Sequence, residues 1–292
     1  MSTMPGAWKL AVTARALVAG LVAGALLAQG AAATENKPAA FRPCIDPNNL
    51  PFADTKGEGF ENRIADLFAK ELGVPVKSYA FPQRMNFIRN TLRYQLPGED
   101  YRCDVVMGVP AGYDQVSATI PYYHSTYVLV YPKGKGLDGM KIGTDLFALP
   151  PETLRKLTIG VYDRSPASKW LVAHGLEAQT KPYPIMSPDP EQYPGEIIEK
   201  DLAEGKIGAA IVWGPIGGYF AKRVRTVDLV VLPLKSEPGV KFDYEIAMGV
   251  RYGEREWKET IEKLIREKRP EIAQILREYN VPIVDEHGEL VP

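Results

Sequence analysis

The sequence predicts an α/β protein with two doubly wound lobes that are joined by a two-segment hinge around a cleft. Strand, helix and turn patterns alternate as β-α-β-α-β over residues 41–109, and a second set begins near residue 157. The run Val105-Val106-Met107 has no polar member, which is typical of a strand covered on both faces in a parallel sheet. Two turn-rich segments, 132–136 and 236–242, predict linkers through which the chain leaves the first lobe and returns.

Each element of the first set is indicated by its own pattern. An amphipathic helix is expected over 60–72, because Ile64, Phe68 and Leu72 recur at helical spacing and Gly73 ends it. A second helix is expected over 83–94. Strands are expected at 41–46, 76–81, 104–109 and 127–131, and a Pro-Gly turn follows the third of them.

The second set repeats the same order without repeating the sequence. Its expected strands cover 157–161, 180–185, 207–213 and 227–234, and its expected helices cover 166–174, 196–203 and 216–223. A strand at 245–251, two helices at 254–268 and 270–279, and a loose tail at 282–292 complete the chain. We therefore expect lobe one to comprise 34–131 and 245–292, and lobe two to comprise 132–244 with the hinge linkers.

The first 33 residues have the pattern of a secretory signal peptide. Lys9 and Arg15 are their only charges, an apolar run covers 16–27, and residues 31–33 are alanines. The alternative is a membrane anchor, but the apolar run is shorter than the ~20 residues that a spanning helix needs. We expect an exported, periplasmic protein with no membrane span after cleavage.

Composition narrows the functional classes. The formal net charge of −1 gives no broad attraction to nucleic acid or to anionic membranes. Cys44 and Cys103 are the only cysteines, and both lie in the exported part, so a single disulfide is expected. The three histidines and two cysteines show no metal-ligand spacing. No hydrolase, zinc-protease or nucleotide-binding motif occurs, so neither an enzyme activity nor a cofactor is expected.

The loops beyond the strand ends are the expected binding region, since ligands of open α/β sheets lie there. Alternatives stay open for several of them. Asp46 and the asparagines after it also suit an ordinary turn. Arg84 suits a solvated helix face, and Tyr122 and Tyr123 suit core packing. The candidate cleft or partner-binding residues are Asp46, Asn48, Asn49, Phe52, Arg84, Pro110, Gly112, Tyr113, Asp114, Tyr122, Tyr123, Arg164, Ser165, Trp213 and Pro215.

The order of elements and the segment CDVVMGVPAGYD…PYY resemble the type-two periplasmic solute-binding proteins, in the branch with amino-acid binders. The resemblance covers residues 40–280 and implies the fold named periplasmic binding protein-like II. Two departures concern ligand chemistry. The loop Pro110–Asp114 lacks the arginine that clamps a ligand carboxylate in those binders, and Trp213 stands where they hold the ligand ammonium with an aspartate. Burying a zwitterion without these anchors would cost several kcal/mol.

Six segments in order resemble a narrower family, the J-type proteins encoded beside quinoprotein methanol dehydrogenases (MxaJ/XoxJ). They are CIDPNNLPF, GEGFENRIA, PQRMNFIRNTL, RCDVVMGVPAGYD, PYYHSTYV and AAIVWGP. The resemblance implies a non-enzymatic accessory role toward a PQQ-dependent methanol or alcohol dehydrogenase, by binding or activating the dehydrogenase or a partner such as its cytochrome c. The alternative is a transporter-type receptor for a small ligand other than a standard amino acid.

Overall fold

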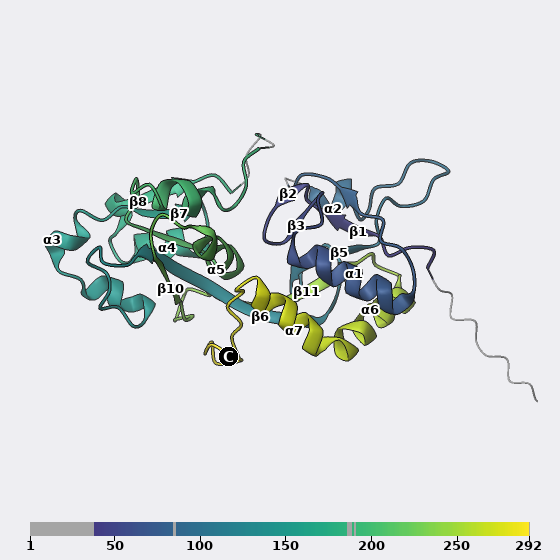
Figure 1. Cartoon of the computed structure of the whole chain (residues 1–292). Helices are drawn as coiled ribbons and strands as arrows, with labels where there is room; N and C mark the ends of the chain where they lie inside the picture. The colour runs from purple at the N-terminus through teal and green to yellow at the C-terminus, as the bar shows by residue number, and fades with distance from the viewer. Residues whose placement is uncertain (1–37, 84–85, 186–188, 190, 292) are drawn as a thin grey trace, which may run out of the picture. The chain divides into compact units, whose positions relative to one another are not determined.

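The computed structural model describes residues 38–83, 86–185, 189 and 191–291 (Figure 1). The expected signal peptide and Arg84 lie outside these residues. Among the described residues, no helix has the length and apolar character needed to cross a membrane.

Nine strands of the described chain form one mixed sheet in the order β4-β1-β5-β11-β6-β9-β7-β8, with β10 paired to β6. The first part, which we call lobe one, holds strands β1 (Pro43–Ile45), β4 (Tyr79–Ala80), β5 (Val105–Pro110) and β11 (Asp243–Val250). Strand β1 pairs in parallel with β4 and β5, and β11 pairs antiparallel with β5. Lobe one therefore has the buried parallel centre expected from its apolar strands.

Three amphipathic helices cover the lobe-one sheet: α1 (Phe60–Leu72), α6 (Arg255–Glu267) and α7 (Arg269–Glu278). Their apolar faces share one core with β5 and β11, in which Phe60, Met107 and Ile261 are fully or almost fully buried. Lobe one also holds a small hairpin of β2 (Asn48–Asn49) and β3 (Ala53–Asp54), which the sequence analysis did not predict.

Lobe two contains the strands β7 (Ile159–Tyr162), β8 (Thr180–Tyr183), β9 (Ala209–Trp213) and β10 (Leu229–Pro233). Its helices are α3 (Pro151–Leu154), α4 (Pro166–Ala173) and α5 (Gly214–Arg223), with the 3-10 helices η1 (Gly143–Ala148) and η2 (Glu177–Gln179) and the π-helix η3 (Ile197–Leu202). Two clusters of buried side chains, one on each face of this sheet, form its core.

The long strand β6 (Ser117–Pro132) belongs to both lobes, and Figure 1 shows it running from one to the other. It pairs with β11 up to Thr126 and with β9 from Tyr127 onward. The crossing linker predicted at 132–136 is therefore wrong, because the chain crosses within β6 itself. Residue Lys133 instead begins a turn, and its backbone N–H donates to the carbonyl of Asp228 at the β10 end. The exact lobe boundaries stay a prediction.

Two further expectations need correction. The helix expected over 83–94 is reduced to α2 (Phe87–Asn90), because Asn86 takes a left-handed φ of 67° and Thr91 leaves the helical region. The tail is not loose in its described part. Ile283 bridges to Ser125 of β6, and the Ser125 hydroxyl donates to the Pro282 carbonyl at 2.6 Å.

The expected disulfide is confirmed. Cys44 of β1 and Cys103 just before β5 are bonded, with their Cα atoms 5.3 Å apart. The bond joins two neighbouring parallel strands of lobe one, and it closes a loop of 59 residues that contains α1, β4 and α2.

Candidate functional site

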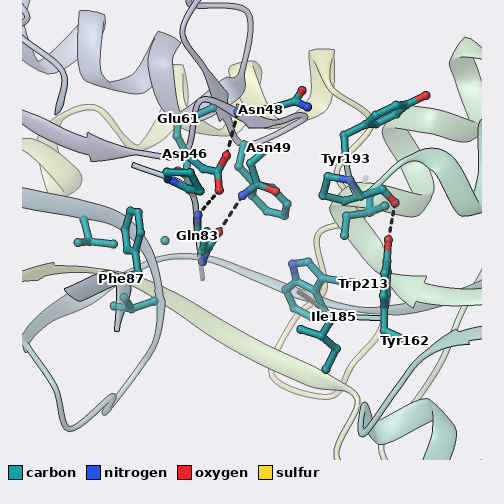
Figure 2. Close-up of a pocket in the computed structure, with 18 of the residues that line it drawn as sticks. Asp46, Asn48, Asn49, Glu61, Gln83, Phe87, Tyr162, Ile185, Tyr193 and Trp213 are labelled. Atoms are coloured by element: carbon teal, nitrogen blue, oxygen red, sulfur yellow. Dashed lines mark hydrogen bonds between the residues drawn. The ribbon is translucent and has the colours of Figure 1, made fainter. Parts of the chain in front are cut away.

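A pocket of about 700 Å³ lies between the two lobes. Figure 2 shows Asp46, Asn48, Asn49 and Gln83 on one side of it, and Tyr162, Tyr193 and Trp213 on the other. Its volume is within the range of small-molecule sites. Most of its lining is apolar or aromatic. The aromatic members are Phe52, Phe87, Tyr123, Tyr127, Tyr162, Tyr193 and Trp213.

The lobe-one wall is built from the loop after β1. The carboxylate of Asp46 accepts hydrogen bonds from the backbone N–H groups of Asn48, at 2.8 Å, and of Gln83. The Asn49 side chain donates to Gln83 Oε1 at 2.9 Å. Asp46 therefore acts as the turn former that its sequence context also suggested, and the turn it fixes presents Asn48 and Asn49 to the pocket.

The lobe-two wall follows the carboxyl ends of β7 and β9. The Tyr162 hydroxyl donates to the Pro194 carbonyl at 2.6 Å, and burial raises the pKa of Tyr162, so the phenol stays neutral. Ser165 caps α4, since its hydroxyl accepts from the Ser168 N–H at 3.2 Å. Arg164 beside it is exposed in a left-handed conformation at φ 57°.

Trp213 ends β9 and lies at the junction of the two lobes. Its ring packs edge-on against Tyr127 of β6 at 5.5 Å and Tyr244 of β11 at 5.9 Å. At this position Trp213 therefore lines the pocket with an aromatic ring rather than a charge.

One contact joins the walls directly. The Asn48 side-chain amide donates to the Glu191 carbonyl at 3.3 Å, which connects the lobe-one hairpin to the loop before η3. The walls are thus close enough to meet at one rim of the pocket.

Glu61, which the sequence analysis missed, lines the same pocket from the first turn of α1. The residue is 8% exposed. A Cβ placed on Gly108 of β5 would lie 2.5 Å from Glu61 Oε1, so a glycine at this strand position leaves room for the carboxyl group. Burial raises the pKa of Glu61 to about 8.

A sequence pattern could have revealed Glu61. It stands three, four and seven residues before Ile64, Ala65 and Phe68, all of which are buried. Helical periodicity therefore places this acid on the apolar face of α1, where a carboxylate is costly unless it has a role.

The structure brings together nine of the predicted residues and leaves five others outside the pocket, while Arg84 lies outside the described residues. Those that line the pocket are Asp46, Asn48, Asn49, Phe52, Pro110, Tyr123, Arg164, Ser165 and Trp213. Gly112, Tyr113, Asp114, Tyr122 and Pro215 do not line it. A role of these residues in partner binding stays a prediction.

The separated residues have structural surroundings of their own. Tyr122 is buried in the lobe-one core, with its ring 4.8 Å from that of Tyr123. Pro215 is buried in the first turn of α5. Tyr113 packs against the cluster around the disulfide, and Asp114 is exposed, its carbonyl accepting from the Tyr252 hydroxyl at 3.0 Å.

The described residues contain no group of three His, Cys, Asp or Glu side chains that could hold a metal ion. Asp46 and Glu61 line the pocket from lobe one and Asp189 lines it from lobe two, and Asp46 is engaged by backbone N–H groups. What the arrangement offers is an aromatic, two-walled cavity with one buried, titratable carboxyl group.

Comparisons with known proteins agree with this geometry. The crystal structure of the periplasmic binding protein XoxJ from Methylobacterium extorquens AM1 matches with a TM-score of 0.67 and 35% identity, over 84% of this chain and 100% of that chain. The crystal structure of MxaJ from Methlophaga aminisulfidivorans MPT matches with a TM-score of 0.68 and 22% identity, over 84% and 100%. Protein MoxJ of Paracoccus denitrificans is 27% identical over 282 residues, which are 91% of this chain and 95% of the relative.

No family model matches the chain. The XoxJ match, however, is above 30% identity and spans that protein completely. The chain belongs to the MxaJ/XoxJ-like family of type-two periplasmic solute-binding proteins.

Proposed function

We propose that this protein is an exported, periplasmic accessory protein of a PQQ-dependent methanol or alcohol dehydrogenase, and that it binds or activates the dehydrogenase through the pocket between its lobes. Membership of the MxaJ/XoxJ-like family supports this role. The observation that carries it is the chemistry of the pocket. An indole occupies the lobe-two anchor position at Trp213, and the loop Pro110–Asp114 offers no guanidinium.

Aromatic side chains favour a protein partner. Trp and Tyr are enriched among the residues that dominate binding energy at protein interfaces, because they bury a large area at little conformational cost. Tyr127, Tyr162 and Trp213 line the pocket while remaining partly exposed. A segment of a partner chain that enters between the walls would cover these rings.

Capture of the dehydrogenase tests the proposal. The mature protein is immobilised and exposed to a purified quinoprotein methanol dehydrogenase, with and without its cytochrome c, and dye-linked alcohol oxidation is measured in parallel. We expect retention and a change in turnover. Trp213→Ala should reduce both, whereas Val172→Ala, an exposed apolar residue on α4, should leave both unchanged. A protein that neither retains the enzyme nor alters its turnover would contradict the proposal.

The same assay tests the predicted partner-binding residues that lie outside the pocket. Tyr113→Ala and Asp114→Ala alter the lobe-one loop outside the pocket. A loss of capture in these variants, with Trp213→Ala unaffected, would move the interface from the pocket to this loop.

One observation favours the alternative, a receptor that delivers a small ligand to a membrane transporter. The pocket has two walls and a volume of about 700 Å³, as sites for small molecules do. A thermal-shift screen of amino acids, alcohols, PQQ, and calcium and lanthanide salts tests it. A ligand at a hundred times its Kd stabilises by about 2.7 kcal/mol, and no shift with any compound would argue against the receptor.

A further inference from the structure

Glu61 has a buried carboxyl group with no counter-charge in the part of the chain that the structure describes. Glu61 is 8% exposed, and no hydrogen bond or ion pair of its side chain occurs among the residues that the structure describes. Its helical neighbours are engaged elsewhere, since Asn62 bonds the Asp54 backbone and Arg63 pairs with Glu278. Buried acids are ordinarily paired, because an isolated charge loses its hydration.

A second polar atom close to Glu61 is also unsatisfied. The hydroxyl of Tyr122 is buried without a hydrogen-bond partner in the described structure. Burial first, and the charges of Tyr123 and Glu61 next, raise the pKa of Tyr122, so the phenol stays protonated and keeps a proton to donate. The two unsatisfied groups belong to α1 and β6, which are separate elements of the lobe-one core.

Aromatic rings line the same pocket as Glu61. Phe52 and Tyr123 both line the pocket and pack against Phe60, at 5.4 Å and 6.0 Å between ring centres. Trp213 lines it from the other lobe. The faces of such rings attract cations, and the attraction increases when the cation is desolvated.

The charged residues that line the pocket also favour a cation. Among the described lining residues, Asp46, Glu61 and Asp189 are acidic and Arg164 is basic. The Arg164 side chain is 83% exposed and lies 3.6 Å from the Asp163 carboxylate, so it points its charge mainly to solvent. A ligand cation would therefore meet a net negative cavity.

We propose that the pocket recognises a primary alkylammonium group, which enters between the aromatic rings and pairs with the Glu61 carboxylate. This inference deepens the proposed function and rests on the pocket being its binding site. The group comes either from a free small amine or from a lysine side chain of the partner dehydrogenase. An alkylammonium has three N–H donors and an apolar stem, which suit a lone carboxylate within an aromatic cavity.

A divalent metal ion is a poorer match to the same residues. Calcium and lanthanide-like hard cations take six or more oxygen ligands, and the described residues supply no cluster of three acids or histidines around Glu61. A single carboxylate suits one monovalent cation.

The protonation of Glu61 gives the inference a measurable signature. With its pKa at about 8, Glu61 is about nine-tenths protonated at pH 7 when the pocket is empty. Pairing with an ammonium group requires the ionised form, so binding releases close to one proton and tightens as the pH rises from 6 to 8.

Among the described residues packed around Glu61, the other titratable groups are less suited to release that proton. Those that face Glu61 from the elements packed on it are Tyr122 and Tyr123 of β6, whose pKa values are also raised. Strand β5 contributes none. On β3, the Asp54 carboxylate accepts hydrogen bonds from two backbone N–H groups. On α7, Glu278 pairs with the Arg63 guanidinium of α1, which lowers the pKa of Glu278.

The test is calorimetric titration of the mature protein with n-butylammonium chloride, 1-butanol or sodium butyrate at pH 7, in phosphate and in MOPS. We expect only n-butylammonium to bind, with about one proton released. Glu61→Gln, confirmed as folded by circular dichroism, should lose about 10- to 100-fold in affinity and the proton release. Asp66→Asn, an exposed acid on the same helix, should match the wild type. Equal binding of all three probes, or unchanged binding in Glu61→Gln, would overturn the inference.

A second experiment separates the two sources of the amine. Lysines of the dehydrogenase are acetylated and capture is measured on wild type and Glu61→Gln. If a partner lysine is the ligand, acetylation weakens capture by the wild type and has no further effect on Glu61→Gln. If a free amine is the ligand, Glu61→Gln loses n-butylammonium binding and captures normally. Failure of capture by the wild type, with n-butylammonium still bound, refutes the accessory role and leaves the ammonium site standing.

Discussion

His124 Nε2 lies 2.8 Å from Asp243 Oδ2, and this pair joins β6 and β11 at the place where the chain passes between the lobes. Asp243 also accepts from the Ser236 hydroxyl in the linker before β11. Burial opposes ionisation of Asp243, but the hydrogen bonds from Ser236 and His124 prevail and lower its pKa.

Removing the Asp243 charge should destabilise the protein in a pH-dependent way. A lowered pKa in the folded state contributes stability that is present above the unfolded pKa, and is lost as the pH falls through the folded pKa below 3.8. Asp243→Asn should therefore cost about 1–3 kcal/mol at pH 7 and less at pH 3. Urea unfolding at both pH values measures this. Asp228→Asn, an exposed acid at the start of β10, is the control, and an equal loss at both pH values would contradict the charge argument.

Glu61→Gln should stabilise the protein, whereas Asp243→Asn should destabilise it. The pKa of Glu61 is about 8 in the fold and 4.5 without it, so the buried acid costs nothing below pH 4.5 and its full penalty above pH 8. We expect the variant to be roughly 2–5 kcal/mol more stable than the wild type at pH 9, and equal to it at pH 4. Chemical unfolding across this range checks the expectation. A variant that is less stable at pH 9 would mean that Glu61 has a stabilising partner.

The Cys44–Cys103 bond should contribute roughly 2–5 kcal/mol, because it shortens the unfolded chain by a loop of 59 residues. A melting experiment with and without a phosphine reductant measures this. The double variant Cys44→Ala/Cys103→Ala serves as control, since reductant should leave its melting temperature unchanged. If the wild type melts at the same temperature under both conditions, the bond does not stabilise the fold.

Arg251 should be the most sensitive charged residue of lobe one. It is 8% exposed, donates to Asp104 at 2.7 Å, and donates to the carbonyls of Leu92 and Cys103. Arg251→Met leaves all three acceptors short of a donor and should cost about 3 kcal/mol. Arg255→Met removes an 88% exposed arginine from its pair with Glu259 and should cost under about 0.5 kcal/mol. Similar losses in the two variants, by urea unfolding, would refute the difference.

Gly218 of α5 should tolerate no side chain. A Cβ there would collide with the Asn280 carbonyl, where the chain leaving α7 passes over lobe two. Gly218→Ala should therefore lower stability by about 1–3 kcal/mol. Gly139→Ala, where nothing lies within 4 Å, should be neutral. Thermal unfolding measures the stability of both variants. An unchanged stability of Gly218→Ala would show that the segment around Asn280 shifts without cost.

The sequence predicted the long helices well, but it predicted the short elements and the long strand β6 poorly. The helices α1, α6 and α7 each carry an apolar stripe over several turns, so their periodicity is clear. The β2–β3 hairpin has strands of two residues, which are too short for any period. The crossing at β6 was missed because only its apolar end at 127–131 was predicted as a strand, and the Pro/Gly-rich segment 132–136 after it was interpreted as the linker. In the structure the strand continues through Pro121, with a register irregularity between its β11 partners Ile246 and Ala247.

For the site, the sequence predicted the loops that line the pocket but not Glu61, the buried carboxyl group. Asp46, Phe52 and Trp213 follow or end strands, and the carboxyl-end rule finds such positions. Glu61 lies inside a helix, where an acid in the first turn is expected in any case. Its burial depends on Gly108, which is 47 residues away and contacts it only in the folded chain.

Tyr123 and His124 are consecutive residues of β6, and their side chains therefore point to opposite faces of the strand. Tyr123 lines the pocket, and His124 forms the hydrogen bond to Asp243 at the crossing. The residue that lines the cavity is thus adjacent in the chain to the residue that joins β6 to β11 at the crossing. Whatever occupies the cavity contacts the strand that both lobes share. Variants of His124 should then change the affinity of an occupant they never touch, and occupancy should change the free energy of the His124–Asp243 interaction by the same amount.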